Sequence, residues 1–161
     1  MTLLSSAASI HFQTRSQENL LRGRVRSFVQ DIITAIHEYA ERLEDNRDRN
    51  RVIDREFLDL IQSEIDIQSR NREYLIQIDD PETRAGIRTY FTRMSAIIVR
   101  MRVAVAQFNE SWEIAQNESV DVIRRDASRA RDNAALTEAH RLCDKLREVA
   151  AGGRGLAARL R

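Results

Sequence analysis

The sequence predicts an all-α protein that folds as an elongated up-down-up-down four-helix bundle. The main observation is that apolar residues recur at alternating steps of three and four in four successive segments, a spacing typical of helices with one buried face. The second is the scarcity of helix breakers, since the 161 residues include one proline and five glycines, and three of those glycines lie in the last ten residues. Short polar stretches separate the four segments, as expected of bundle connections.

The first helix is predicted over residues 16–45, with Thr14 or Ser16 as its cap. Its apolar residues follow steps of four and three and are Val25, Val29, Ile32, Ile36, Tyr39 and Leu43. Residues 1–15 lack both the basic start and the long apolar run of a standard secretory signal. We therefore expect them to form a flexible N-terminal segment, with an unconventional export signal as the alternative.

The second helix is predicted over residues 50–78, after the polar stretch DNRDRNR at 45–51. Its inward residues are expected to be Ile53, Phe57, Leu60, Ile61 and Ile65. The stretch 66–73 is polar apart from Ile67. It should be exposed or frayed, because an unpaired buried polar group costs about 1–3 kcal/mol.

The third helix is predicted over residues 81–116. Asp80 is a good N-cap, Pro81 suits the first helical position, and Glu82 lies in the first turn. One apolar seam then runs through Ile87, Phe91, Met94, Ile98, Met101, Val105, Phe108 and Trp112. The run at 96–108 is too short for a membrane span, at about 13 residues where roughly 20 are needed. Arginines at 100 and 102 interrupt it.

The same helix carries a second apolar stripe, which makes it apolar on two faces. The stripe consists of Ala96, Val99, Val103 and Ala106, in steps of 3, 4 and 3. Two interpretations stay open: burial within the chain's own bundle, or self-association through this face.

The fourth helix is predicted over residues 119–150, capped by Asn117 or Ser119 and ended by Gly152 and its neighbours. Its expected stripe is Val120, Ile123, Ala127, Ala130 and Ala134, then Ala135, Ala139, Leu142, Leu146 and Val149. Residues 151–161 are predicted to be a glycine-linked C-terminal tail. Such a tail could dock on another protein through Leu156, Arg159, Leu160 and Arg161, or simply fray.

The C-terminal part of the chain is its basic part, with ten basic and five acidic side chains over residues 122–161. An anionic partner such as nucleic acid or lipid headgroups would meet Arg124, Arg131, Arg141 and Lys145. However, acidic residues stand three or four positions before several of these arginines, as in helix ion pairs, and the helix has no aromatic residue on which bases could stack.

Several kinds of active site are absent from the sequence. Bundles that bind two metal ions use Glu-x-x-His pairs, but Thr34 and Thr137 stand three residues before His37 and His140. Cys143 is alone, and no phosphate-loop or dinucleotide glycine motif occurs. We therefore expect no catalytic residues, no metal and no cofactor.

These observations favour a non-enzymatic helical interaction module of bacterial or viral origin, acting as an adaptor, secreted effector or assembly component. Its partner is expected to be another protein, with a homodimer as one form, and its location cytoplasmic. The main alternative is a peripheral binder of anionic surfaces that uses the Arg-rich fourth helix and the tail. A third class, an enzyme or ligand carrier with a site in the bundle core, would need a cavity near the polar centre of the second helix.

Overall fold

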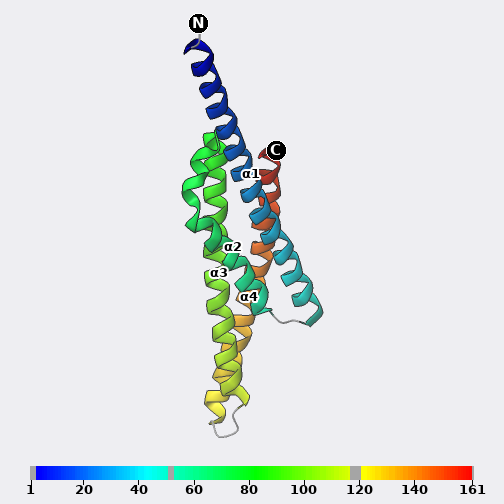
Figure 1. Ribbon diagram of the computed structural model, residues 1–161. Coiled ribbons are helices and arrows are strands. Elements are labelled where there is room, and N and C mark those ends of the chain that lie inside the picture. The colour runs from blue at the N-terminus through cyan, green and yellow to red at the C-terminus, as the bar shows by residue number, and fades with distance from the viewer. Residues whose placement is uncertain (1–2, 51–52, 117–120, 161) are drawn as a thin grey trace.

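The computed structural model describes residues 3–50, 53–116 and 121–160, and the side chains of these residues except those of 3–15, 48–50 and 125. It is 94% helical, and the described residues contain no strand. The elements are α1 (Leu3–Asn50), α2 (Arg55–Arg70), the 3-10 helix η1 (Arg72–Gln77), α3 (Pro81–Gln116) and α4 (Val122–Arg159). Successive long helices run in opposite directions (Figure 1). The predicted all-α helical bundle is thus confirmed.

The predicted apolar seams of α1 and α3 form much of the core. The largest fully buried side chains come from all the main elements and are Ile33, Ile36, Leu43, Leu58, Ile61, Leu75, Ile87, Met94, Ile98, Met101, Leu142 and Leu146. Along the α3 seam, residues from Ile87 to Val105 are buried, whereas Phe108 is half-buried and Trp112 is 51% exposed. The seam therefore continues past the end of the core.

The start of α3 is the boundary that agrees best with the sequence. Asp80 accepts hydrogen bonds at Oδ2 from the backbone N–H of Thr83, at 2.9 Å, and at Oδ1 from that of Glu82, at 3.2 Å. The Thr83 hydroxyl also donates to Oδ2. These bonds lower the pKa of Asp80 because they favour its charged form, and the bond from the Thr83 hydroxyl has the largest effect. The predicted range of 81–116 is correct.

The second helix is not continuous, so the predicted range of 50–78 is wrong. Asp54 caps α2 by accepting the Glu56 N–H at 2.9 Å, and α2 ends at Arg70. The Asn71 side chain donates to the Ile67 carbonyl oxygen at 2.7 Å, which satisfies a carbonyl at the helix end. The inward face is also rotated from the predicted one: Leu58 and Gln68 are buried, while Phe57 and Leu60 are half-buried.

The first helix is longer than predicted at both ends. Its backbone is helical from Leu3 to Asn50, so the predicted start at residue 16 and the predicted end at residue 45 are both wrong, whereas the flexibility expected of residues 1–15 stays a prediction. No proline and no glycine precedes Gly23, which leaves the backbone without a strong breaker. Near its other end, the Asn46 side chain donates to Asp54 Oδ2 at 3.2 Å and thereby links α1 to the cap of α2.

The fourth helix begins and ends later than predicted. Asp121 is the cap and accepts the Ile123 N–H at 3.2 Å, while the predicted caps Asn117 and Ser119 lie outside the described residues. The helix continues through all three glycines to Arg159, so the flexible glycine-linked tail is not observed. A helical glycine costs about 1 kcal/mol relative to alanine. Packing of the last turns on α1 and α3 offsets this cost.

Those last turns contact the body of the bundle directly. The Cα of Gly153 lies against Tyr90 and Ile33, where an added Cβ would be 2.6 Å from the Tyr90 ring. Leu160 is 4% exposed, and Leu156 packs onto Gly86 of α3. Gln30 of α1 donates from Nε2 to the Ala157 carbonyl oxygen at 2.8 Å. The C-terminal segment is therefore a packed part of α4.

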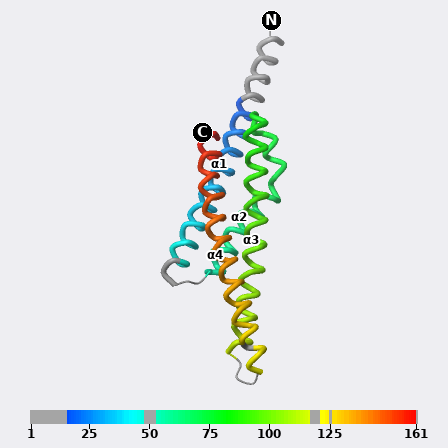
Figure 2. The backbone as a smooth tube through the Cα atoms, turned by 180° about the vertical axis from the view of Figure 1, so that it is seen from behind, coloured from blue at the N-terminus to red at the C-terminus, as the bar shows by residue number. Residues whose placement is uncertain are grey.

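The molecule is elongated because the helices are unequally covered. α3 and α4 lie side by side as a long antiparallel hairpin, and the end of α1 and the start of α2 lie partway along it (Figures 1 and 2). Near the end of α1 and the start of α2, ion pairs join these helices to the hairpin. Arg47 of α1 pairs with Asp144 of α4, and Asp59 of α2 pairs with Arg102 of α3. Beyond them, residues 108–116 and 122–134 form a projecting hairpin end that extends past the described parts of α1 and α2 (Figures 1 and 2).

Candidate functional site

The candidate sites of this protein are grooves and exposed apolar surfaces on its helices. Among residues 3–50, 53–116 and 121–160, no three His, Cys, Asp or Glu side chains gather where a metal ion could bind. His37 instead pairs with Glu41, one turn along α1, at 3.1 Å. The described helices also include none that is both long and apolar enough to cross a membrane.

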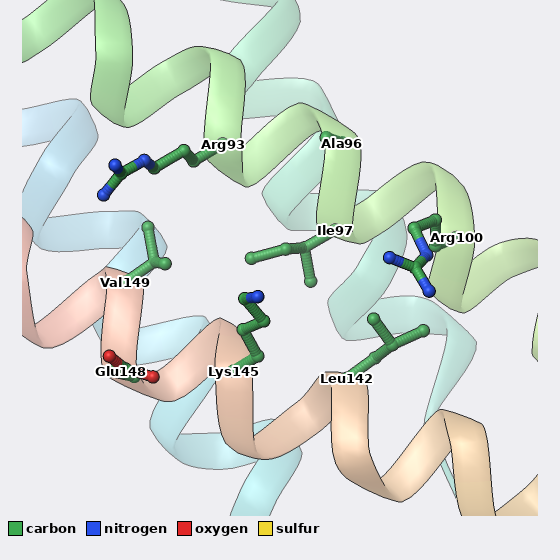
Figure 3. Close-up of a pocket in the computed structure, with 8 residues that line it drawn as sticks. All are labelled: Arg93, Ala96, Ile97, Arg100, Leu142, Lys145, Glu148 and Val149. Carbon is green, nitrogen blue, oxygen red and sulfur yellow. The ribbon is translucent and has the colours of Figure 1, made fainter.

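One groove lies between α3 and α4 and has a cavity of about 430 Å³. On α3, Arg93 and Arg100 extend on either side of Ile97, and Lys145 extends from α4 toward them (Figure 3). The complete lining is Arg93, Ala96, Ile97, Arg100, Leu142, Lys145, Glu148 and Val149. We call this the cationic groove, because its walls carry three cations and one carboxylate above an apolar floor.

The charges of the cationic groove are only partly neutralised. Arg100 donates to Glu138 Oε1 at 2.8 Å across the two helices. Arg93 and Lys145 have no carboxylate partner within the described part of the chain. Such a groove can accept an anionic group, although solvent weakens each exposed charge interaction.

The four cations predicted to form one anionic-partner face are distributed over different surroundings. Arg141 forms an ion pair with Glu138 at 2.7 Å, which lowers the pKa of the Glu138 carboxyl. Lys145 lines the cationic groove, whereas Arg131 lines a second groove beside Ser128. Arg124 is exposed near the start of α4, about 30 Å along the helix from Lys145. All four are exposed, and a shared anionic-partner face stays a prediction.

The second stripe on the third helix is exposed along its whole length. Val99 is 55% and Val103 is 53% exposed, and Ala96 and Ala106 at its ends are exposed as well. We call these four residues the outer α3 stripe. Of the two interpretations of this stripe, burial against the chain's own helices is not observed among the described residues. A contact with another chain stays a prediction.

The projecting hairpin end exposes aromatic surface and has a partly polar interior. Trp112 stacks on Phe108 with ring centroids 6.1 Å apart. Between the helices, Ser111, Ser128 and Asp132 are buried, and Asp132 Oδ1 has no hydrogen-bond partner there. Desolvation raises the pKa of the Asp132 carboxyl. Sequence periodicity did not identify these three residues, because their type is not apolar.

The residues predicted to form the apolar stripe in the first half of α4 are not buried, so that part of the prediction is incorrect. Ala127, Ala130 and Ala134 are exposed, and Ile123 is 78% exposed, whereas Val120 lies outside the described residues. The second half is correct, since Ala135, Ala139, Leu142 and Leu146 are buried. The one-residue slip in the apolar spacing marks the point where the contacting face changes.

The residues of the predicted docking tail contact their own chain. Leu160 is buried and Leu156 is half-buried in the bundle, while Arg159 lies 3.8 Å from Glu82. Arg161 lies outside the described residues. The two leucines are spaced by one helical turn, as the sequence indicated, but Leu156 contacts Gly86 of α3 and Leu160 belongs to the buried core of the same molecule.

Comparisons with known proteins add no relative: no protein-family model, no curated protein and no solved structure matches this chain.

Proposed function

We propose that this protein is a non-enzymatic helical interaction module, of the adaptor or assembly type, that binds another protein through the exposed sides of the α3–α4 hairpin. One observation carries the proposal. Nine large apolar side chains among the described residues are exposed, and five of them lie on this hairpin: Val99, Val103, Trp112, Val122 and Ile123. Val99 and Val103 lie one turn apart on one face of α3, Trp112 lies on another face, and Val122 and Ile123 lie at the start of α4. Neighbouring exposed apolar side chains such as Val99 and Val103 are characteristic of protein contact sites.

The middle of the hairpin is suited to this role because ion pairs join it to the rest of the fold. α1 contacts it through the ion pair of Glu44 with Arg147 at 2.6 Å, and α2 through that of Asp59 with Arg102. A rigid surface loses little conformational freedom on binding, so more of the contact free energy contributes to affinity. Trp112 adds the residue type that most often dominates such contacts.

Affinity capture from the source cells, with sequence-matched variants, tests the proposal. We expect the wild type to retain a defined set of proteins that Val99→Glu/Val103→Glu or Trp112→Ala loses. The control Ala151→Glu/Ala158→Glu adds the same two charges at exposed positions of α4 and should retain that set. If no protein is retained, or if all four proteins retain the same set, the proposal is wrong. Circular dichroism establishes that the variants stay helical.

A second candidate function is the binding of anionic surfaces, which Arg93 and Lys145 of the cationic groove favour because they have no ion-pair partner among the described residues. This function predicts retention on heparin or on phosphatidylserine vesicles that falls steeply with salt, because the contact is mainly electrostatic. Arg93→Gln/Lys145→Gln should then abolish retention. An apolar protein contact through the hairpin is instead little affected by salt and by these two substitutions.

A further inference from the structure

We propose that the first partner of the hairpin is a second copy of this chain, bound by antiparallel packing of the outer α3 stripe against its own counterpart. The two-fold axis passes at the level of Met101, so that Val99 faces the second copy's Val103 and Ala96 faces its Ala106. This inference goes beyond the proposed function, since the self-association holds whether or not the hairpin binds another protein. It uses a face that the chain itself leaves uncovered.

The stripe is self-complementary in residue type and spacing. It consists, in order, of alanine, valine, valine and alanine, separated by 3, 4 and 3 residues. A two-fold contact between identical chains requires that if one residue meets another, the reverse contact also forms. In an antiparallel helix pair centred on residue 101, both the valine pairs and the alanine pairs meet in a single register. The small terminal alanines let the helices approach closely.

The charges beyond the stripe decide between antiparallel and parallel packing. Arg88 precedes Val99 by 11 residues, and Glu110 follows it by 11, so all three lie on nearly the same face of α3. Antiparallel packing brings Arg88 beside the second copy's Glu113 and within one turn of its Glu110. Parallel packing would instead oppose like charges at both ends, which is unfavourable.

These flanking charges are available for such a contact. Arg88, Glu110 and Glu113 are exposed, and none has an ion-pair partner among the described residues. A single pair of helices buries less than the roughly 800 Å² per partner of a standard interface. We therefore expect a weak dimer with a dissociation constant in the micromolar range, which weakens as salt screens the terminal pairs.

Disulfide trapping with single-cysteine additions tests the register. A mixture of Val99→Cys and Val103→Cys chains should form covalent dimers on oxidation, because residue 99 of one copy faces residue 103 of the other. Each variant alone should not, since its two thiols are offset by about 6 Å along the helix axes. The buried Cys143 thiol makes the wild type the background control. If each variant alone forms covalent dimers, and mixing the two variants forms no additional Val99→Cys–Val103→Cys dimer, the packing is parallel and the proposed register is wrong.

Sedimentation over a range of concentrations tests the dimer itself. The wild type and the control Ala151→Glu/Ala158→Glu should associate at about 100 μM, whereas Val99→Glu/Val103→Glu should stay monomeric. Arg88→Glu should weaken the dimer several-fold, and Arg88→Glu/Glu113→Arg should recover most of the loss. A wild type that stays monomeric at that concentration overturns the inference.

The two tests separate this inference from the proposed function. A monomeric wild type that still captures a protein through Val99 and Val103 contradicts the second copy and leaves the interaction module standing. A dimer in the predicted register that captures no other protein supports the self-association and contradicts the adaptor role.

Discussion

The three glycines near the end of α4 differ in what surrounds them, although all three are helical. A Cβ on Gly153 would be 2.6 Å from Cε2 of Tyr90 and 3.0 Å from Cγ2 of Ile33, whereas a Cβ on Gly152 or Gly155 would meet nothing within 4 Å. Gly153 is thus required by the close approach of α4 to α1 and α3. Its two neighbours have no such requirement.

Alanine substitution at these positions should therefore have opposite effects. Gly153→Ala should lower the free energy of unfolding by about 1–3 kcal/mol, because the added methyl group displaces the Tyr90 ring. Gly152→Ala should raise it by about 0.5–1 kcal/mol, because alanine loses less backbone entropy in a helix. Urea denaturation of the two variants measures both effects, and equal changes at the two positions would contradict the packing of α4.

Asp132 places a carboxylate where its charged form is poorly solvated. The residue is 8% exposed and its Oδ1 has no hydrogen-bond partner in the described structure. Because its pKa is raised, the folded state binds the proton more readily than the unfolded state does. The charged Asp132 carboxylate therefore lowers the free energy of unfolding at neutral pH. This loss disappears as the pH falls through the raised pKa of Asp132.

Asp132→Asn should consequently be more stable than the wild type at neutral pH. We expect a gain of roughly 0.5–2 kcal/mol, because the buried charge is removed while the shape is kept. The gain should shrink as the pH falls through the raised pKa of the wild-type Asp132, because the wild-type carboxyl then takes up a proton. Asp126→Asn, at an exposed position on the same helix, is the control and should change little at either pH. A gain that does not vary with pH would contradict this account.

At the scale of the helices, the end of α4 and the break in α2 have different origins. Residues 151–159 stay helical because Leu156, Leu160 and the Ala157 carbonyl all find partners on α1 and α3. α2 ends because Asn71 supplies a local side-chain cap, while Leu75 and Ile78 beyond it are still buried. Tertiary contacts thus extend one helix past three glycines, and a local hydrogen bond ends another.

Truncation after Val149 should therefore destabilise the whole bundle rather than remove a tail. The deletion takes away the buried Leu160 and the half-buried Leu156 and uncovers the surfaces of Tyr90 and Ile33. We expect a loss of at least about 3 kcal/mol in the free energy of unfolding, from the magnitude of buried leucine deletions. Thermal denaturation by circular dichroism measures it, with the exposed substitution Arg154→Gln as a control expected to change little.

At the scale of the whole molecule, unequal helix coverage produces the surfaces proposed for binding. α3 and α4 have 36 and 38 residues, whereas α2 has 16 and η1 has 6. The second segment is too short to follow the hairpin to its end, which leaves Trp112 half exposed. The outer α3 stripe lies uncovered for a different reason, since it faces away from the neighbours that bury Ile98 and Met101.

The sequence by itself determined the helical class, the existence of the long segments, the start of α3 at Pro81 and the buried seams of α1 and α3. These features depend on local capping and on periodicity, which single residues and their spacing encode. Only the tertiary structure decided where α1 and α4 end, which face of early α4 meets α3, and which apolar residues stay exposed. These depend on contacts between distant segments: Gly153 stays helical because α4 packs closely on Tyr90 there, and Val99 is exposed because none of the described helices covers it.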